Sequence, residues 1–89
     1  MKILKIGAVW CVNCIVMRSV WEEVEREFPQ IETEFIDIDD ETSELARKYD
    51  VKDIPVTIFL DAAGEEKEVL KGTRNKEEMV KKIKEIFNI

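Results

Sequence analysis

Hydrophobic and polar positions follow two different periods in the first third of the chain. Residues 3–9 are mostly apolar, which predicts a short strand that is buried on both faces. From residue 11 the period becomes helical, and Pro29 ends the predicted helix because proline cannot continue it. The apolar stripe of this helix is made of Cys14, Met17, Trp21, Val24 and Phe28.

The middle of the chain predicts a second strand and a short second helix. Residues 31–39 alternate imperfectly and carry several carboxylates, as an edge strand does to discourage pairing with another molecule. Residues 40–43 offer several N-cap side chains for the short helix that we expect to follow. Its apolar face would consist of Leu45, Ala46 and Tyr49.

The last part of the chain predicts a hairpin and a terminal helix. Residues 56–60 are the most strand-like run, and residues 65–71 form the second arm after a turn. Asn75, with Glu78 three positions later, resembles a capping box at the start of the final helix. The apolar stripe of this helix is made of Met79, Val80, Ile83, Ile86 and Phe87.

The predicted order is β-α-β-α-β-β-α, which is an α/β architecture in a single domain over residues 1–89. The first two strands should be parallel because a helix connects them, and the hairpin should add an antiparallel edge. We therefore expect a four-stranded mixed sheet flanked by three helices.

Composition excludes several function classes. The chain has a net charge of -6 and its basic residues form no block, which argues against nucleic acid as a partner. It has no histidine, which excludes histidine acid–base chemistry and Cys/His zinc sites. Two cysteines are too few for a secreted disulfide scaffold. The chain has no signal peptide pattern and no apolar run long enough to cross a membrane, so we expect a soluble cytoplasmic protein. We also expect it to be a monomer.

The two cysteines carry the candidate chemistry. Cys11 and Cys14 are spaced Cys-x-x-Cys at the start of the first predicted helix. The backbone N–H groups and the dipole at a helix start favour the anionic form of the first sulfur, and the thiolate is the attacking species in disulfide exchange. We expect Cys11 to be exposed at the helix tip and to attack a substrate disulfide. Cys14, expected on the inward face, would then resolve the mixed disulfide.

Two other readings of this pair stay open at the level of sequence. Two thiolates are half of the four ligands of a typical zinc or iron–sulfur site, so a metal or cluster module would need a dimer or outside ligands. Alternatively, the chain is an interaction domain without turnover, in which the cysteines are incidental. We expect no metal in the site.

The motif stretches resemble thioredoxin-like proteins over nearly the whole chain. Residues 8–14, Ala-Val-Trp-Cys-Val-Asn-Cys, are similar to the Ala-x-Trp-Cys-Gly-Pro-Cys of that family. Residues 49–55, Tyr-Asp-Val-Lys-Asp-Ile-Pro, are similar to its Tyr-x-hydrophobic-x-x-Ile-Pro. Gly64 and Gly72 also fall where the family places glycines. The resemblance implies a thioredoxin-like fold in a minimal form, closer to glutaredoxin in size.

The resemblance also implies roles for individual residues. Cys11 would be the nucleophile and Cys14 the resolving thiol of a protein dithiol–disulfide oxidoreductase. Pro55 would be cis and packed against the disulfide, with the backbone of Ile54 pairing with an extended substrate peptide. The remaining residues expected to bind substrate are Trp10, Val12, Asn13, Gly72 and Thr73.

The implied partners are protein disulfides and an electron donor, either a thioredoxin-reductase-like flavoprotein or another dithiol protein. Such a protein would serve electron transport and cell redox homeostasis. We expect no cofactor apart from the redox-active Cys11–Cys14 disulfide itself.

Three positions depart from the family pattern. Val12-Asn13 replaces Gly-Pro, so the redox potential of the family cannot be assumed for the Cys11–Cys14 pair of this chain. Lys5 replaces a buried aspartate thought to assist proton transfer at the resolving cysteine. Lys5 is either a strand-end lysine that reaches water, or a cation under the site that stabilises a thiolate.

Overall fold

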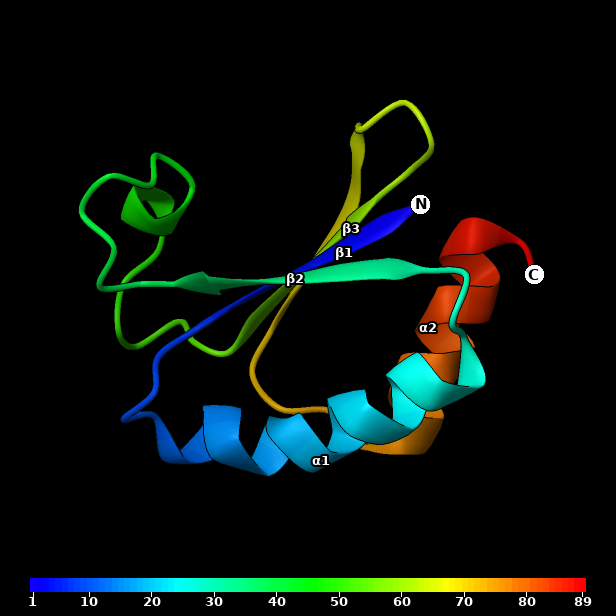
Figure 1. The fold of residues 1–89 in the computed structure, drawn as a ribbon, viewed down its shortest axis with the longest axis horizontal. Helices are drawn as coiled ribbons and strands as arrows, with labels where there is room; N and C mark the ends of the chain where they lie inside the picture. Colours follow the sequence, from blue (N-terminus) through cyan, green and yellow to red (C-terminus); the bar gives the residue numbers. More distant parts are fainter.

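Four strands form one mixed sheet in the order β2-β1-β3-β4 in the computed structural model, which describes all of residues 1–89 (Figure 1). β1 (Lys2–Gly7) and β3 (Val56–Leu60) are central, whereas β2 (Glu32–Asp37) and β4 (Glu66–Lys71) are the edges. β1 is parallel to β2 and antiparallel to β3, and β3 is antiparallel to β4. The predicted parallel pair, edge strand and hairpin are therefore confirmed.

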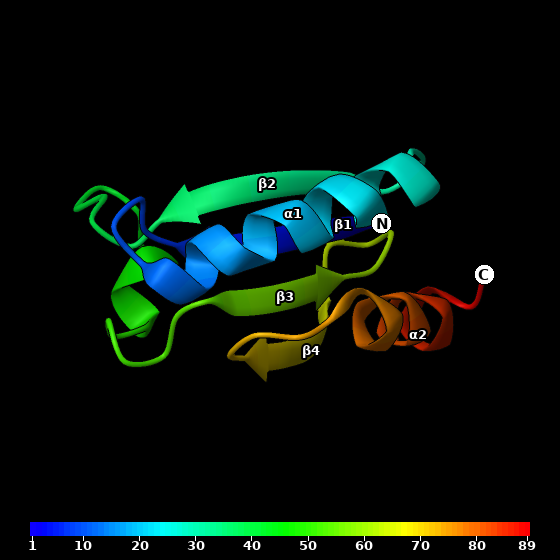
Figure 2. The same cartoon turned by 90° about the horizontal axis from the view of Figure 1, so that it is seen from below.

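Both α-helices cover the same face of this sheet (Figure 2). α1 (Val12–Glu27) ends just before Pro29, and the N–H of its C-cap Phe28 still donates to the Val24 carbonyl at 2.9 Å. α2 (Lys76–Phe87) begins with the predicted capping box, in which the Asn75 and Glu78 side chains each accept from the other's backbone N–H. Neither helix is long and apolar enough to span a bilayer.

The expected second helix is wrong, so two α-helices flank the sheet and not three. In its place lies η1 (Ala46–Lys48), a single turn of 3-10 helix. The polar residues before it bind their own backbone: Asp40 Oδ1 accepts from both the N–H and the hydroxyl of Thr42, and Ser43 Oγ accepts from the Ala46 N–H. Such local bonds offer the backbone an alternative to an α-helix.

The main core lies between the sheet and the two helices. Every second residue of a strand faces the helices, and the helix stripes predicted from the sequence meet them there. Phe59 is fully buried at the centre and lies edge-on to the Phe87 ring, with 6.0 Å between ring centroids. The cluster consists of Ile3, Met17, Trp21, Val24, Phe28, Ile31, Phe59, Leu70, Met79, Ile83 and Phe87.

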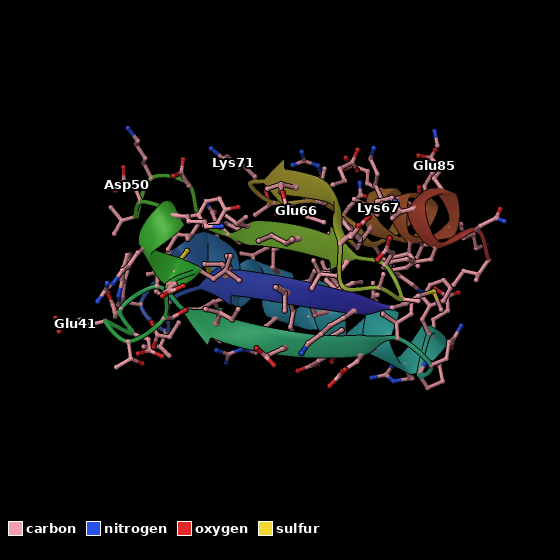
Figure 3. The ribbon with its side chains drawn as sticks, turned by 90° about the horizontal axis from the view of Figure 1, so that it is seen from above. Glu41, Asp50, Glu66, Lys67, Lys71 and Glu85 are labelled. Carbon is pink, nitrogen blue, oxygen red and sulfur yellow. The ribbon has the colours of Figure 1, made fainter.

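A smaller core lies on the opposite face, onto which Figure 3 looks, with the helices behind the sheet. The irregular segment around η1 covers only one end of this face, and charged side chains such as Glu66, Lys67 and Lys71 border it along β4. The cluster consists of Leu4, Ile6, Ala8, Cys11, Ile54, Val56 and Ile58. It reaches the start of α1, where it includes the first cysteine.

Candidate functional site: a dithiol at the start of α1

Cys11 is the N-cap residue of α1. Its backbone is extended, and its Sγ accepts a hydrogen bond from the backbone N–H of Cys14 at 3.2 Å. The first helical bond, from Ile15 N–H to the Cys11 carbonyl, measures 3.0 Å. A sulfur at this position receives an N–H of the first helical turn and the positive end of the helix dipole, which both stabilise a thiolate.

Cys14 lies one turn further along and behaves differently. Burial, and then a hydrogen bond with Cys11, raise the pKa of the Cys14 thiol from 9.0 to about 11, against an opposing contact with the Ala8 backbone. Its thiol therefore keeps its proton at neutral pH. The two sulfurs are not joined by a disulfide in this structure. They form an asymmetric pair, because Cys11 caps the helix and the pKa of Cys14 is raised.

The expected difference in exposure is wrong. Cys11 is only 8% exposed, because it packs in the same cluster as Ala8 and Ile54, whereas Cys14 is half-buried. The exposed groups around Cys11 are its chain neighbours Trp10 and Val12. The order of roles therefore rests on the N-cap contact and on the raised pKa of Cys14, and not on exposure.

The loop before β3 meets the same site. The Ile54–Pro55 peptide bond is cis, as predicted. The Pro55 carbonyl accepts from the Gly72 N–H at 2.8 Å, which joins this loop to the loop after β4. Asp53, in the loop before β3, and Lys71, the last residue of β4, form an ion pair of 3.5 Å. Two segments that are far apart in sequence are thus fixed side by side next to the dithiol.

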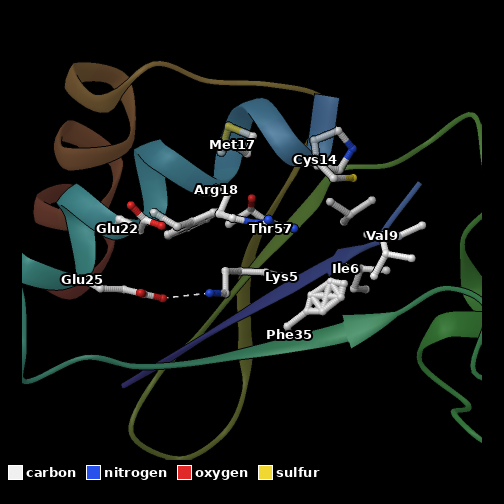
Figure 4. A pocket seen from close by; sticks show the side chains of 15 residues that line it. Lys5, Ile6, Val9, Cys14, Met17, Arg18, Glu22, Glu25, Phe35 and Thr57 are labelled. Carbon is white, nitrogen blue, oxygen red and sulfur yellow. Dashed lines mark hydrogen bonds and ion pairs between the residues drawn. The ribbon is translucent and has the colours of Figure 1, made fainter. Parts of the chain in front are cut away.

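Pro55 and Cys14 line one cavity of about 350 Å³, here called the Cys14 pocket (Figure 4). It lies between α1 and the β1–β2 side of the sheet, on the helix-covered face. Its walls also include Lys5, Gly7, Arg18, Trp21, Phe35 and Thr57.

The other residues predicted to bind substrate are spread around the dithiol. Trp10 is 52% exposed, and its indole N–H donates to Asp39 at 2.7 Å, which ties the turn before α1 to the segment after β2. Val12 and Asn13 are exposed on the first turn of α1. Gly72 has a φ of 92°, which favours glycine.

Two of the predicted residues contribute less directly. The Ile54 side chain is buried, whereas its backbone N–H and carbonyl form no hydrogen bond with other backbone groups. The Thr73 side chain is exposed and makes no hydrogen bond, so nothing in the geometry ties it to the dithiol beyond its place next to Gly72. Ile54 is thus available through its backbone alone.

Lys5 is not a strand-end residue, so that reading is wrong. It lies within β1, and its ammonium donates to Glu25 Oε1 at 2.8 Å and lies 5.5 Å from the centroid of the Trp21 ring. Glu25 follows Cys14 by eleven residues in the same helix, a rise of about 16 Å. The ammonium is therefore held toward the far end of α1, and its effect on a thiolate stays a prediction.

Gly7 is a site residue that the sequence reasoning passed over. A Cβ at this position would lie 2.8 Å from the Cys14 Sγ, so a side chain here would displace the thiol. The signal was present, because a glycine inside a strand often marks a close approach. Separately, the structure brings together no group of three or more His, Cys, Asp or Glu side chains that could hold a metal.

Comparisons with known proteins agree with this arrangement. The thioredoxin family model matches residues 1–85. Thioredoxin H4-1 of Oryza sativa subsp. japonica is 33% identical over 81 residues, which are 91% of this chain and 60% of that protein. The chain spans 42 to 60% of the length of the plant relatives that it matches.

Solved structures match nearly the whole chain. Thioredoxin NaTrxh from Nicotiana alata is 28% identical with a TM-score of 0.80, covering 97% of this chain and 72% of that one. Thioredoxin 1 from Thermosipho africanus is 26% identical with a TM-score of 0.76, covering 96% and 92%. The fold implied by the sequence resemblance is thereby confirmed, apart from the missing third helix. The family match, the shared fold and the Cys-x-x-Cys pair together show that this chain belongs to the thioredoxin family.

Proposed function

We propose that this chain is a thiol–disulfide oxidoreductase that exchanges disulfides with protein substrates through Cys11 and Cys14. The observation that carries the proposal is the Cys14 N–H bonded to the Cys11 sulfur at 3.2 Å, at the N-terminus of α1. Membership of the thioredoxin family supports the same reaction class.

In the first step the Cys11 thiolate attacks one sulfur of a substrate disulfide. A mixed disulfide between Cys11 and the substrate forms, the substrate S–S bond breaks, and the second substrate sulfur leaves as a thiolate that takes up a proton. The bond from the Cys14 N–H prepares this step, because it stabilises the anionic sulfur before the substrate arrives.

In the second step Cys14 loses its proton and attacks the Cys11 sulfur. The mixed disulfide breaks, the second substrate thiol is released, and the Cys11–Cys14 disulfide forms, so two electrons have passed to the substrate. Because the pKa of Cys14 is about 11, this thiol does not compete for the first attack at neutral pH. Its proton leaves only during resolution.

Substrate docking follows from what surrounds Cys11. The sulfur itself is nearly buried, so a substrate must approach over the exposed Trp10 and Val12. The free backbone groups of Ile54, beside the cis Pro55, offer strand-like hydrogen bonds to an extended peptide. Gly72 borders the same place without a side chain that would block it.

The proposal includes the partners expected from the sequence. A thioredoxin-reductase-like flavoprotein or another dithiol protein would reduce the Cys11–Cys14 disulfide again. We also propose that the protein works as a cytoplasmic monomer. Gel filtration tests the monomer, and a stable dimer in reducing buffer would contradict it.

The direct test is reduction of insulin disulfides by dithiothreitol. The wild-type chain should accelerate the reaction, and Cys11→Ser should abolish the acceleration. In a separate mixture from which dithiothreitol has been removed, pre-reduced Cys14→Ser should trap a mixed disulfide with insulin that mass spectrometry detects. Wild-type and Cys11→Ser proteins that both match dithiothreitol alone would contradict the proposal. The chain would then be an interaction module.

The reduction potential decides the direction of exchange. A value near about -270 mV would make the protein a reductant, whereas a value above about -200 mV would make it an oxidant or isomerase. Equilibration with glutathione buffers measures it. Because Val12 and Asn13 separate the two sulfurs, their replacement by Gly-Pro is the matched comparison for this measurement.

A further inference from the structure

The Cys14 pocket is not used by the proposed reaction. Its volume of about 350 Å³ falls within the range of small-molecule sites in proteins. It opens beside α1 and not over the Cys11 sulfur, so a molecule bound in it would reach the dithiol from the Cys14 side (Figure 4).

The pocket has aromatic walls. Trp21 lines it as a buried residue of α1, and Phe35, which is 49% exposed, lines it from β2. Val9 and Pro55 add further apolar surface toward the dithiol. The space exists beside β1 because Gly7 carries no side chain there. Aromatic rings prefer the edge-on and offset contacts that two such walls provide.

One hydroxyl in the wall of the pocket has no hydrogen-bond partner in the protein. It belongs to Thr57, which lines the pocket from β3 and is 2% exposed. The oxygen itself is not fully enclosed by the protein, so a ligand in the pocket can reach it and form a hydrogen bond. The Thr57 hydroxyl therefore points to a ligand with one hydrogen-bonding group.

The charges around the pocket cancel. Lys5 and Glu25 are paired with each other at 2.8 Å. Arg18 and Glu22 are exposed on successive turns of α1 and are of opposite sign. Neither a net anion nor a net cation is favoured by such a lining, which selects an uncharged molecule.

We propose that the Cys14 pocket binds a small uncharged aromatic alcohol, with its ring between Trp21 and Phe35 and its hydroxyl on Thr57. The inference goes beyond the proposed exchange reaction and does not depend on it. A ligand here lies against Cys14 and leaves the Cys11 surface and the Ile54 backbone free for a substrate peptide.

The test is an NMR titration of the reduced wild-type chain with p-cresol, observing the methyl groups of Val9 and Met17 in the pocket and of Ile58, on the opposite face of the sheet, as a reference. Saturable shifts at Val9 and Met17 should give a dissociation constant of about 1 mM or below, an affinity within reach of a ligand of this size. Toluene, which lacks the hydroxyl, should bind roughly fivefold more weakly, the usual effect of one net hydrogen bond.

Matched molecules and variants isolate each contact. p-Methylbenzoate and p-methylbenzylamine should both bind more weakly than p-cresol, because the charged lining cancels. Thr57→Val keeps the shape of the side chain and should remove the preference for p-cresol over toluene. Thr42→Val, in the exposed loop before η1, should leave that preference unchanged.

Four results would overturn the proposal. The first is the absence of saturable binding below about 10 mM, because weaker binding would not indicate a formed site of this size. The second is tighter binding of either charged probe, and the third is an unchanged preference in Thr57→Val. The fourth is competition between p-cresol and insulin, seen as a raised KM for insulin, because the pocket would then belong to the substrate peptide. The first three are measured without the exchange reaction, so they leave the proposed function untouched.

Discussion

The two ends of α1 meet the sheet in different ways. At the C-terminal end large side chains fill the interface, and Phe59, Met79 and Ile83 are completely buried there. At the N-terminal end the strand beside the helix presents Gly7, and the helix and sheet leave the Cys14 pocket between them. One helix thus contributes its second half to stability and its first half to chemistry.

The difference shows that an 89-residue chain uses separate regions for stability and for the dithiol site. A small domain buries too little surface to leave much of its core unfilled. Here the unfilled part adjoins the dithiol, where apolar residues are also exposed, among them Val12, Ile15 and Val16. The packed end holds α1 in place, and this fixes the N-cap geometry at the other end.

The largest expected effect is at the packed end. Phe59→Ala should destabilise the fold by about 3 to 5 kcal/mol, because it removes a fully buried ring and its contact with Phe87. Urea unfolding measures this loss. Phe35→Ala, on the same face but 49% exposed, is the control and should cost less than about 1 kcal/mol. Equal losses of unfolding free energy in the two variants would show that the packed end does not contribute more to stability than the open end.

A smaller effect is expected at the open end from Gly7→Ala. Its Cβ would meet the Cys14 Sγ at 2.8 Å, so we expect a loss of about 1 to 3 kcal/mol and a changed reduction potential. In a Cys14→Ala background the same substitution should cost less than about 1 kcal/mol, since the clashing sulfur is gone. An equal cost in both backgrounds would show that Gly7 serves the strand and not the thiol.

The Lys5–Glu25 pair lies between the two ends, and Glu25→Gln should cost about 1 kcal/mol at neutral pH because the pair is partly exposed. Burial raises the pKa of Glu25, but hydrogen bonds from Lys5 and Thr33 outweigh it, and the net pKa is lowered. The stabilisation is therefore present above the usual carboxyl range and is lost as the pH falls through the lowered pKa.

Urea unfolding of wild type and Glu25→Gln at neutral and acidic pH measures this effect, and the difference between them should shrink in acid. Glu22→Gln is the control, since Glu22 is exposed on the same helix without an ion-pair partner. A difference that stays constant with pH would mean that packing, and not charge, accounts for the loss.

The last effect is absent at neutral pH and appears only in alkali. The unfolded chain releases the Cys14 proton near pH 9.0, whereas the folded chain holds it to about 11. The unfolded state therefore binds fewer protons in this window, and the stability of the reduced protein should fall as the pH rises from 9.0 to about 11. Unfolding of wild type and Cys14→Ser with an added reductant measures it, and parallel pH profiles would contradict the raised pKa.

Much of the fold was readable from local pattern. The stripe from Met17 to Phe28, the stop at Pro29 and the Asn75–Glu78 capping box each depend on residues within a few positions of one another. The parallel pairing of β1 and β2 followed from the connecting helix alone. The second helix failed for a local reason as well, because Asp40 and Ser43 bind the backbone that the helix would have used.

The sequence by itself determined which chemistry is present: two thiols at a helix start, no histidine, and a proline loop to meet them. Only the tertiary structure decided how that chemistry is tuned. Cys11 is buried in a cluster that includes residues of β1, of β3 and of the loop before β3. Lys5 of β1 donates a hydrogen bond to Glu25 of α1, and the absence of a side chain at Gly7 leaves space for the Cys14 sulfur. These contacts join positions far apart in the chain, and no local pattern encodes which side chains will share one space.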